Sequence, residues 1–161
     1  MPHPANFIIT NARAFTADPA NPHAEAVAVS SQKIVFVGTA ADAENWRGPR
    51  TRLIDAGGRT LMPGFIDSTF NPMPGVSAAL NRQPWAPGLP DHRQTLADTL
   101  IAYTRDAAYA EFQENVKGQL HPGLLADMVL LSDDIFTVPV EAIDQVHPVM
   151  TLCGGRVVYE A

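Results

Sequence analysis

The chain has 161 residues, of which 46% are hydrophobic and 17% are charged, proportions typical of a globular protein with a core. Its net charge of −6 argues against nucleic acid and anionic membranes as partners, because both favour clustered Lys and Arg. No apolar run approaches the roughly 20 residues of a membrane-spanning helix, and the N-terminus MPHPANFIIT lacks a signal-peptide pattern. The single cysteine, Cys153, excludes an internal disulfide, and we expect a cytoplasmic protein.

The N-terminal 68 residues predict β structure. NFIITN and ARAFT flank a turn at residues 11–13, and EAVAVSSQKIVFVG predicts a hairpin that turns at residues 30–32. Thr39 is placed to cap a short helix that runs to Trp46. TRLIDAGGRTLMPGFID then adds two short strands around a Gly-Gly turn.

The middle of the chain changes character. Residues 69–94 contain five prolines, a density typical of a linker, with a short helix predicted at residues 76–82. Residues 95–112 predict one longer, core-packing helix, because apolar residues recur at steps of three and four. The members of this stripe are Leu96, Leu100, Tyr103, Ala107 and Ala110.

The C-terminal part returns to β structure. A strand is predicted at residues 126–131, a turn of helix at 140–146, and a hairpin around Gly154-Gly155 that leaves Cys153 partly buried. We therefore predict a mainly β fold, a composite β-sandwich or small barrel built from both chain ends, with two or three helices from the middle. Its parts are residues 1–68 and 113–161 as the two halves of one sandwich, with residues 69–112 as a Pro-rich linker and helices.

Several segments resemble the amidohydrolase superfamily, in particular its large exoenzyme-like subgroup of metal-dependent hydrolases. Near the start these are FIITNARAFT, EAVAVSSQKIVFVG and LIDAGGRTLMPGFIDS, and near the end TLADTLIAYTRDAAYAEF, VKGQLHPGLLADMVLLSDDIF and VMTLCGGRVVYE. The resemblance covers most of the chain. It implies a β-sandwich formed by both chain ends, with a catalytic (β/α)8 barrel of about 250 residues between them.

The sequence departs from this family where the first metal ligands are expected. In the family the PGFID strand continues into His-x-His, and by register those positions are Thr69 and Asn71. Either both ligands were substituted in place, or two family segments are joined here and the barrel is missing. Length favours the second alternative, because residues 69–94 cannot hold six or seven βα units. FNPMPGVSAALNRQ also resembles family sequence after the last barrel strand, so we place the join near Ser68 and Thr69.

Few residues remain as candidates for chemistry. Asp67 is the one weak catalytic candidate, and we expect it to be a surface or capping carboxylate. The five histidines are scattered, and none lies one, three or four residues from another. Because a zinc centre needs three or four convergent ligands, we predict no metal or cofactor-binding residues in this chain.

The family resemblance implies one or two divalent ions, often zinc, that activate water in the parent enzymes. We expect this chain to be a non-catalytic scaffold domain of a metal-dependent amidohydrolase that acts on non-peptide carbon–nitrogen bonds, inactive alone and without its own cofactor. Two alternatives stay open: an interaction or oligomerisation module, or a subunit that completes a hydrolase site with a separate barrel chain.

Loss of the barrel also predicts an uncovered apolar surface. The candidates are the helix residues Leu96, Leu100 and Tyr103 and the strand Phe65-Ile66. Monomers rarely expose apolar patches of more than a few hundred Å². Either residues 69–112 fold back over this surface, or the chain self-associates through it.

Overall fold

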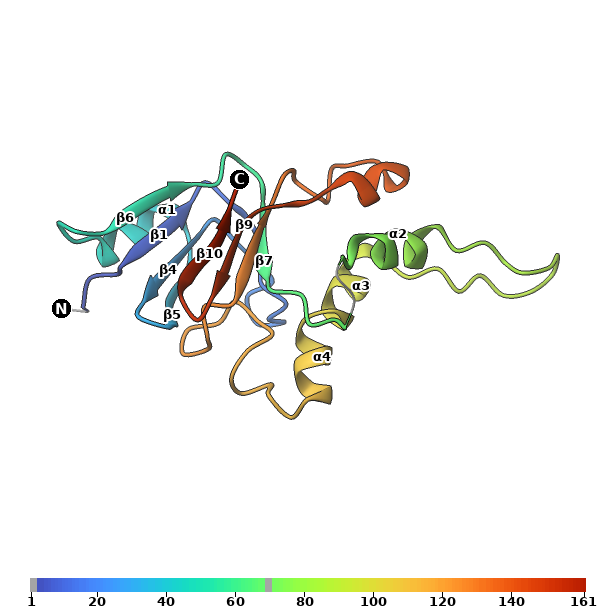
Figure 1. Cartoon of the computed structure of the whole chain (residues 1–161), viewed down its shortest axis with the longest axis horizontal. Coiled ribbons are helices and arrows are strands. Elements are labelled where there is room, and N and C mark those ends of the chain that lie inside the picture. Colours follow the sequence, from blue (N-terminus) through green and yellow to red (C-terminus); the bar gives the residue numbers. More distant parts are fainter. Residues whose placement is uncertain (1–2, 69–70) are drawn as a thin grey trace.

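The computed structural model describes residues 3–68 and 71–161. Within these ranges, ten strands form two mixed sheets that pack face to face, and helices cover the outer side of each sheet (Figure 1). Neither sheet of the described residues closes into a barrel on its own. The predicted mainly β fold with helices from the middle of the chain is therefore confirmed.

The first sheet is built entirely from the N-terminal part of the chain. Its strands in spatial order are β5 (Lys33–Gly38), β4 (Ala26–Ser30), β1 (Phe7–Thr10) and β6 (Arg52–Asp55). The β4–β5 hairpin is antiparallel as predicted, whereas β1 and β6 are parallel. Helix α1 (Ala40–Ala43) and the 3-10 helix η1 (Glu44–Trp46) follow, and Thr39 caps α1 by accepting from the Asp42 N–H at 3.1 Å.

The second sheet combines both ends of the chain. Its order is β10 (Arg156–Glu160), β9 (Pro148–Cys153), β8 (Met128–Leu131), β7 (Thr60–Pro63), β2 (Arg13–Phe15) and β3 (His23–Ala24). Strand β7 pairs in parallel with β2 and antiparallel with β8, so the N-terminal and C-terminal strands meet at the β7–β8 ladder. An ion pair of 2.8 Å between Arg52 Nη2 and Glu160 Oε1 joins the edge strands β6 and β10 of the two sheets.

Three apolar clusters follow from the alternation of side chains along the strands. In β1, Phe7 and Ile9 face the core between the sheets, whereas Ile8 packs in a small cluster with Ala43 and Trp46. In β7, Leu61 faces the core between the sheets and Met62 faces the opposite side. Both faces of the central strands are therefore buried.

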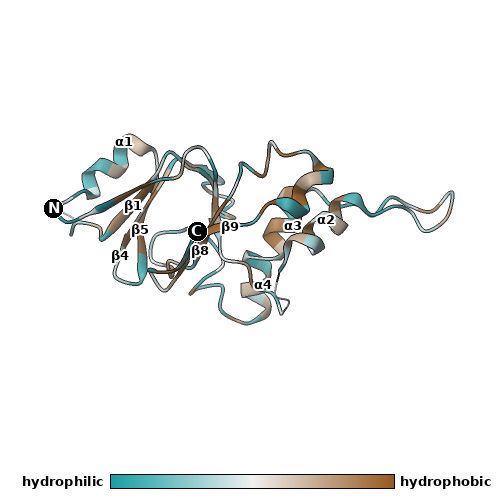
Figure 2. Cartoon of the chain, turned by 45° about the horizontal axis from the view of Figure 1, so that its top comes forward, coloured by the Kyte–Doolittle hydropathy of each residue, from teal (hydrophilic) through white to brown (hydrophobic). Residues whose placement is uncertain are grey.

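Helices from the middle of the chain cover the outer face of the second sheet. α2 (Met73–Asn81), α3 (Leu96–Ala102) and the 3-10 helix η2 (Val140–Gln145) pack there, and Figure 2 shows hydrophobic residues gathered in the strands and on α3. Leu100 is fully buried, and Leu96, Tyr103 and Phe65 pack against the same cluster. The described part of residues 69–112 thus folds back over the apolar surface that the predicted loss of a barrel would expose, and self-association stays a prediction.

The single long helix predicted for residues 95–112 is wrong. The chain forms α3, leaves the helical path at Thr104, and starts a second short helix, α4 (Arg105–Ala110). The Tyr103 carbonyl accepts from the Ile66 N–H at 2.8 Å, and the buried Thr104 hydroxyl donates to the Leu100 carbonyl at 2.7 Å. These tertiary and local hydrogen bonds divert the backbone although the apolar spacing continues.

Cys153 also differs from expectation, because its side chain is exposed. It is the last residue of β9, where alternation turns Leu152 inward and Cys153 outward. Two other segments agree with the sequence: α2 starts three residues before the predicted residues 76–82, and η2 occupies the predicted turn of helix.

Candidate functional site

The segment after β7 is where the sequence places the first residues of a hydrolase site. The Gly64 N–H donates to the Asp127 carbonyl at 3.0 Å, and the Ile66 N–H donates to the Tyr103 carbonyl at 2.8 Å. The rings of Phe65 and Tyr103 meet edge to face, with centroids 6.1 Å apart. The segment is therefore held against β8 and α3 as far as Ile66, and Asp67 and Ser68 follow it on the exposed surface.

The family resemblance predicts histidines at the positions of Thr69 and Asn71. Thr69 lies outside the described residues. The Asn71 Oδ1 accepts a hydrogen bond of 3.1 Å from the N–H of Met73, the first residue of α2. Asn71 thus satisfies one of the free N–H groups at a helix start, which is a capping role.

The histidines do not gather around a metal site. Across residues 3–68 and 71–161, no three His, Cys, Asp or Glu side chains lie close enough to hold an ion. The Nδ1 atoms of His121 and His147 lie 2.8 and 3.1 Å from the carbonyls of Pro122 and Gln145. Because a catalytic zinc takes about three protein ligands, the described residues do not fit the metal centre that the family resemblance implies.

The structure reveals a groove that the sequence did not predict, which we call the β3 groove. It has a volume of about 540 Å³ and lies beside the edge strand β3. Its principal side chains are Arg13, Phe15, His23, Glu25, Asp134 and Phe136. These come from three separate parts of the sequence, residues 13–15, 23–25 and 134–136, and only the fold brings the three parts together.

Three rings form the wall of the β3 groove. The ring centroids of Phe15 and Phe136 are 5.5 Å apart, and His23 lies 6.4 Å from each of them. Phe15 is buried, whereas 43% of Phe136 remains exposed at the groove. Such a wall offers an open aromatic surface on which a further ring can pack.

Two carboxylates are fixed at the rim of this groove. The Glu25 Oε2 accepts from the Ala40 N–H at 3.0 Å. The Asp134 Oδ1 accepts from the Phe136 N–H and from the Thr60 hydroxyl, both at 3.2 Å. With Arg13 as the opposing charge, the groove combines an aromatic wall and a rim of net negative charge, which suits binding of a flat, positively charged group.

No helix within the described residues is long and apolar enough to cross a membrane.

Comparison with known proteins connects the chain to one family. The profile described as "Amidohydrolase family" matches residues 68–159, which is more than half of the chain. The exoenzymes regulatory protein AepA of Pectobacterium carotovorum subsp. carotovorum is 37% identical over 68 residues, covering 42% of this chain and 15% of that protein. The N-substituted formamide deformylase of Arthrobacter pascens is 38% identical over 63 residues, covering 39% of this chain and 12% of that protein. The matched part therefore spans less than a sixth of either relative.

A solved structure shows the same fold over nearly the whole chain. The crystal structure of an amidohydrolase from Thermotoga maritima MSB8 superimposes with a TM-score of 0.63. The superposition covers 96% of this chain and 100% of that chain, at 10% sequence identity. The likeness therefore concerns the fold alone.

Proposed function

This chain belongs to the amidohydrolase family, and from that premise we propose that it is a scaffold domain without catalytic activity of its own. One observation carries the proposal. Strand β7 ends at Pro63 and α2 begins at Met73, so residues 64–72 occupy the place where a complete enzyme of this kind would hold a catalytic barrel. The family profile begins at Ser68, within this connection, which supports a join at that position.

The parent enzymes of this scaffold would be metal-dependent hydrolases of non-peptide carbon–nitrogen bonds. The name of the Arthrobacter pascens relative, a formamide deformylase, supports this reaction class. The described residues of this chain supply no cluster that fits a zinc ion, and Asn71 serves as a helix cap. Asp67 lies on the exposed surface of the connection.

We further propose that residues 1–68 and 113–161 fold as one domain around the β7–β8 ladder, with residues 69–112 covering one face. The pairing of Leu61 with Leu130 and of Met62 with Val129 supports this division. A cytoplasmic location is part of the same proposal, because a chain with one cysteine gains nothing from an oxidising compartment.

The experiment is a metal and activity test on the complete chain. After gel filtration in zinc-supplemented buffer we expect clearly less than one equivalent of zinc, and no turnover of N-acyl amino acids or formamides. The double variant Thr69→His with Asn71→His should still retain less than one equivalent, because it provides two ligands where a catalytic zinc takes about three. One retained equivalent in the unaltered chain, with turnover that Asp67→Ala abolishes, would place an active site here and overturn the proposal.

A further inference from the structure

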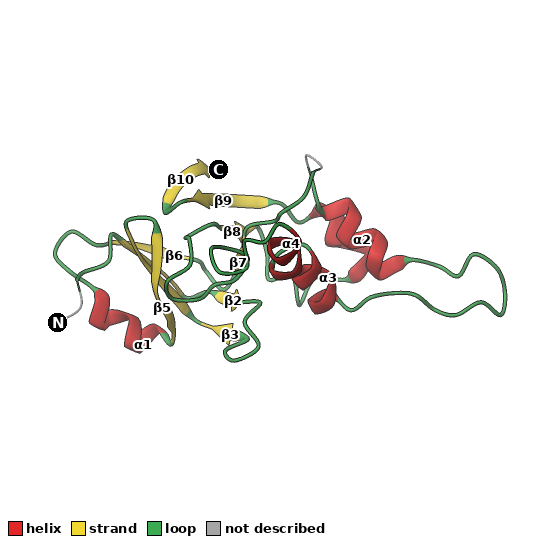
Figure 3. Cartoon of the chain, turned by 90° about the horizontal axis from the view of Figure 1, so that it is seen from below, coloured by secondary structure: helices red, strands yellow, loops and turns green. Residues whose placement is uncertain are grey.

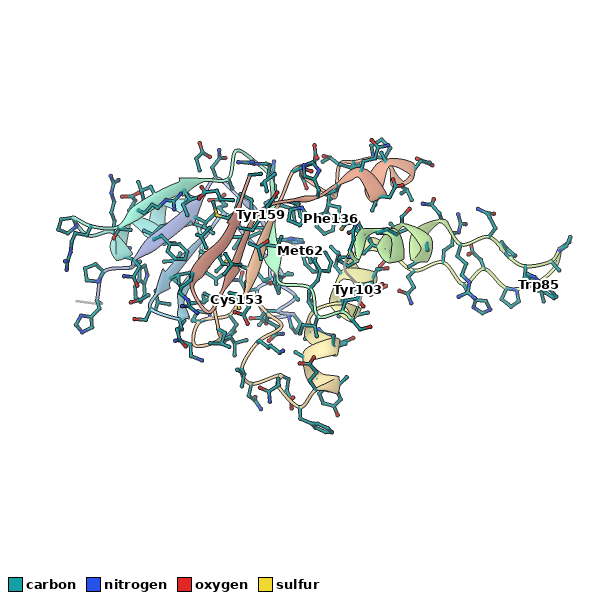
Figure 4. The ribbon with its side chains drawn as sticks, in the orientation of Figure 1. Met62, Trp85, Tyr103, Phe136, Cys153 and Tyr159 are labelled. Atoms are coloured by element: carbon teal, nitrogen blue, oxygen red, sulfur yellow. The ribbon has the colours of Figure 1, made fainter. Side chains whose placement is uncertain are left out.

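Between α2 and α3 the chain forms a long projection, residues 82–94, which we call the arm. Figure 3 shows it running away from the helices, and Figure 4 shows Trp85 far out along it. Trp85 is 95% exposed and Leu89 is 47% exposed. Tryptophan is highly buried on average, so a nearly bare indole on a projection is typical of a residue that is buried by a partner.

The arm is shaped for binding. Three prolines, Pro84, Pro87 and Pro90, restrict its backbone, and the Leu89 N–H closes a turn on the Ala86 carbonyl at 3.3 Å. The Gln94 N–H donates to the Ala79 carbonyl at 3.1 Å, which fixes the base of the arm to α2. A restricted arm loses less conformational entropy when it binds than a flexible loop would.

The arm is also a positively charged stretch of an acidic chain. It carries Arg82, Asp91 and Arg93, whereas the whole chain has a net charge of −6. Arg93 Nη2 and Asp91 Oδ2 are 2.6 Å apart, and the hydrogen bonds from Arg93 lower the pKa of Asp91 to about 2. That pair neutralises itself, so the exposed Arg82 is the uncompensated charge three residues before Trp85.

The β3 groove has the complementary properties. Its aromatic wall of Phe15, His23 and Phe136 exposes Phe136, on which an indole can pack. The carboxylates of Glu25 and Asp134 are opposite in charge to Arg82 of the arm. Its volume of about 540 Å³ lies within the roughly 300–1,000 Å³ of pockets that bind compact organic groups. Figure 4 shows Phe136 beside the sheet, well away from Trp85 of the same chain.

We propose that two copies of this chain form a dimer by exchanging arms, with Trp85 of each copy seated in the β3 groove of the other. Both parts are present once in each chain, so the exchange can be reciprocal, as in a two-fold dimer. The contact surface differs from the Leu96, Leu100 and Tyr103 stripe, which is packed against the sheet.

The first test is the mass of the complete chain by sedimentation or light scattering, from micromolar to submillimolar concentrations. The unaltered chain should dimerise, and Trp85→Ala or Phe136→Ala should each weaken the dimer on the order of 30-fold or more, the effect expected of an interface hot spot. Phe112→Ala is the matched control, since Phe112 is 88% exposed beside α4 and lines neither the arm nor the groove. It should leave the dimer unchanged, and circular dichroism should show all variants folded.

A mixing experiment then tests which surfaces meet. Trp85→Ala keeps an intact groove and Phe136→Ala keeps an intact arm, so an equimolar mixture should form heterodimers when neither variant dimerises alone. In a Trp46→Phe background Trp85 is the sole tryptophan of the chain, and its emission should shift to shorter wavelength as the dimer forms.

Three results would overturn the proposal. The first is an unaltered chain that stays monomeric throughout the concentration range. The second is a dimer that resists Trp85→Ala, which would place the interface elsewhere, for example on Val158 and Tyr159 of β10. The third is a dimer that is lost with Trp85→Ala but kept with Phe136→Ala and Glu25→Gln, which would show that the arm binds outside the β3 groove.

Discussion

Asn11 donates a hydrogen bond of 2.8 Å from its Nδ2 to the Oδ1 of Asp55, at the point where the chain crosses twice between the sheets. Asn11 lies between β1 and β2, and Asp55 is the last residue of β6, just before the connection to β7. The two parallel strand pairs β1–β6 and β2–β7 therefore pass from one sheet to the other side by side. The Gly58 N–H also donates to the Asn11 carbonyl at 2.8 Å. The two crossings are thus fastened to each other by side chain and backbone.

This contact predicts a pH effect. The hydrogen bonds from Asn11 and then from the Gly57 N–H lower the pKa of Asp55 in the folded chain. The ionised Asp55 carboxylate therefore adds to the free energy of unfolding at pH values above the ordinary Asp pKa of the unfolded chain. This contribution is lost as the pH falls through the lower pKa of the folded chain. In Asn11→Gly the folded pKa of Asp55 should rise toward its unfolded value, so less stability should be lost to protonation of Asp55 on acidification.

Glycine is chosen because Asn11 has a φ of +53°, which alanine would occupy with strain. Carboxyl NMR titration measures the Asp55 pKa directly, and acid unfolding followed by circular dichroism measures the consequence. Asn115→Gly, at an exposed position far along the chain, serves as the control. An unchanged Asp55 pKa in Asn11→Gly would show that the Asn11 contact does not hold the carboxylate.

Thr60 predicts a larger change in stability. Its fully buried Oγ1 accepts from the Ile135 N–H at 3.1 Å and donates to Asp134 Oδ1 at 3.2 Å. Thr60→Val keeps the shape but leaves the Ile135 N–H without its acceptor, which should lower the free energy of unfolding by about 1–3 kcal/mol. Urea unfolding measures the change.

The control for Thr60 is another buried threonine, Thr99. Its hydroxyl donates to the Thr95 carbonyl, which also accepts from the Thr99 N–H within the helix. Thr99→Val therefore leaves no buried donor unsatisfied, and we expect it to cost less than about 1 kcal/mol. Equal costs for the two variants would contradict the role assigned to the Thr60–Ile135 bond.

Two neighbouring glycines give a third prediction. Gly154 and Gly155 both have positive φ, +53° and +70°, at the β9–β10 turn. A Cβ on Gly154 would meet open space, whereas a Cβ on Gly155 would collide with the backbone carbonyl of Ser31 in the β4–β5 turn. The two hairpin turns therefore pack directly against each other.

Gly154→Ala should cost about 1–2 kcal/mol, since it places one residue in the left-handed region. Gly155→Ala should cost about 1–3 kcal/mol more, because the Ser31 backbone must also move. Thermal unfolding of the two variants compares them under identical conditions. If both variants melt at the same temperature, the packing of the turns contributes nothing.

The sequence predicted this fold to different extents in different places. Strand alternation and turn residues are local, so β4, β5, β9 and β10 were found nearly in place. The end of α3 depends on the hydrogen bond from the Ile66 N–H to the Tyr103 carbonyl. These two residues are 37 positions apart in the sequence, and apolar spacing within the helix cannot reveal such a contact.

The candidate sites likewise combine local features that the sequence predicts with long-range contacts that it does not. Family register predicts a histidine position at Asn71, but the hydrogen bond from the Met73 N–H to Asn71 Oδ1 needed the geometry of α2. The β3 groove joins Phe15 to Phe136 across 121 positions. Only the folded sheet brings these rings together, so the groove had no signature in the sequence.

The last prediction concerns how the two ends of the chain fold. In a fragment of residues 1–68, β7 would lose its β8 partner, and Leu61 and Met62 would lose the side chains that bury them. An unpaired strand with apolar residues on both faces favours aggregation over folding. We expect this fragment to show no cooperative thermal unfolding, and addition of a 69–161 fragment to restore cooperative unfolding and the β-sheet circular dichroism of the intact chain.

A cut in the arm provides the matched control. Gly88 lies at the exposed turn of the arm, so a chain divided after Gly88 keeps every β-ladder and both faces of the second sheet within one non-covalent complex. Because loop tips tolerate nicking, the fragments 1–88 and 89–161 should stay associated and melt cooperatively. A cooperative melt of residues 1–68 alone would contradict the shared core, since it would show that the N-terminal strands bury a sufficient core before β8, β9 and β10 arrive.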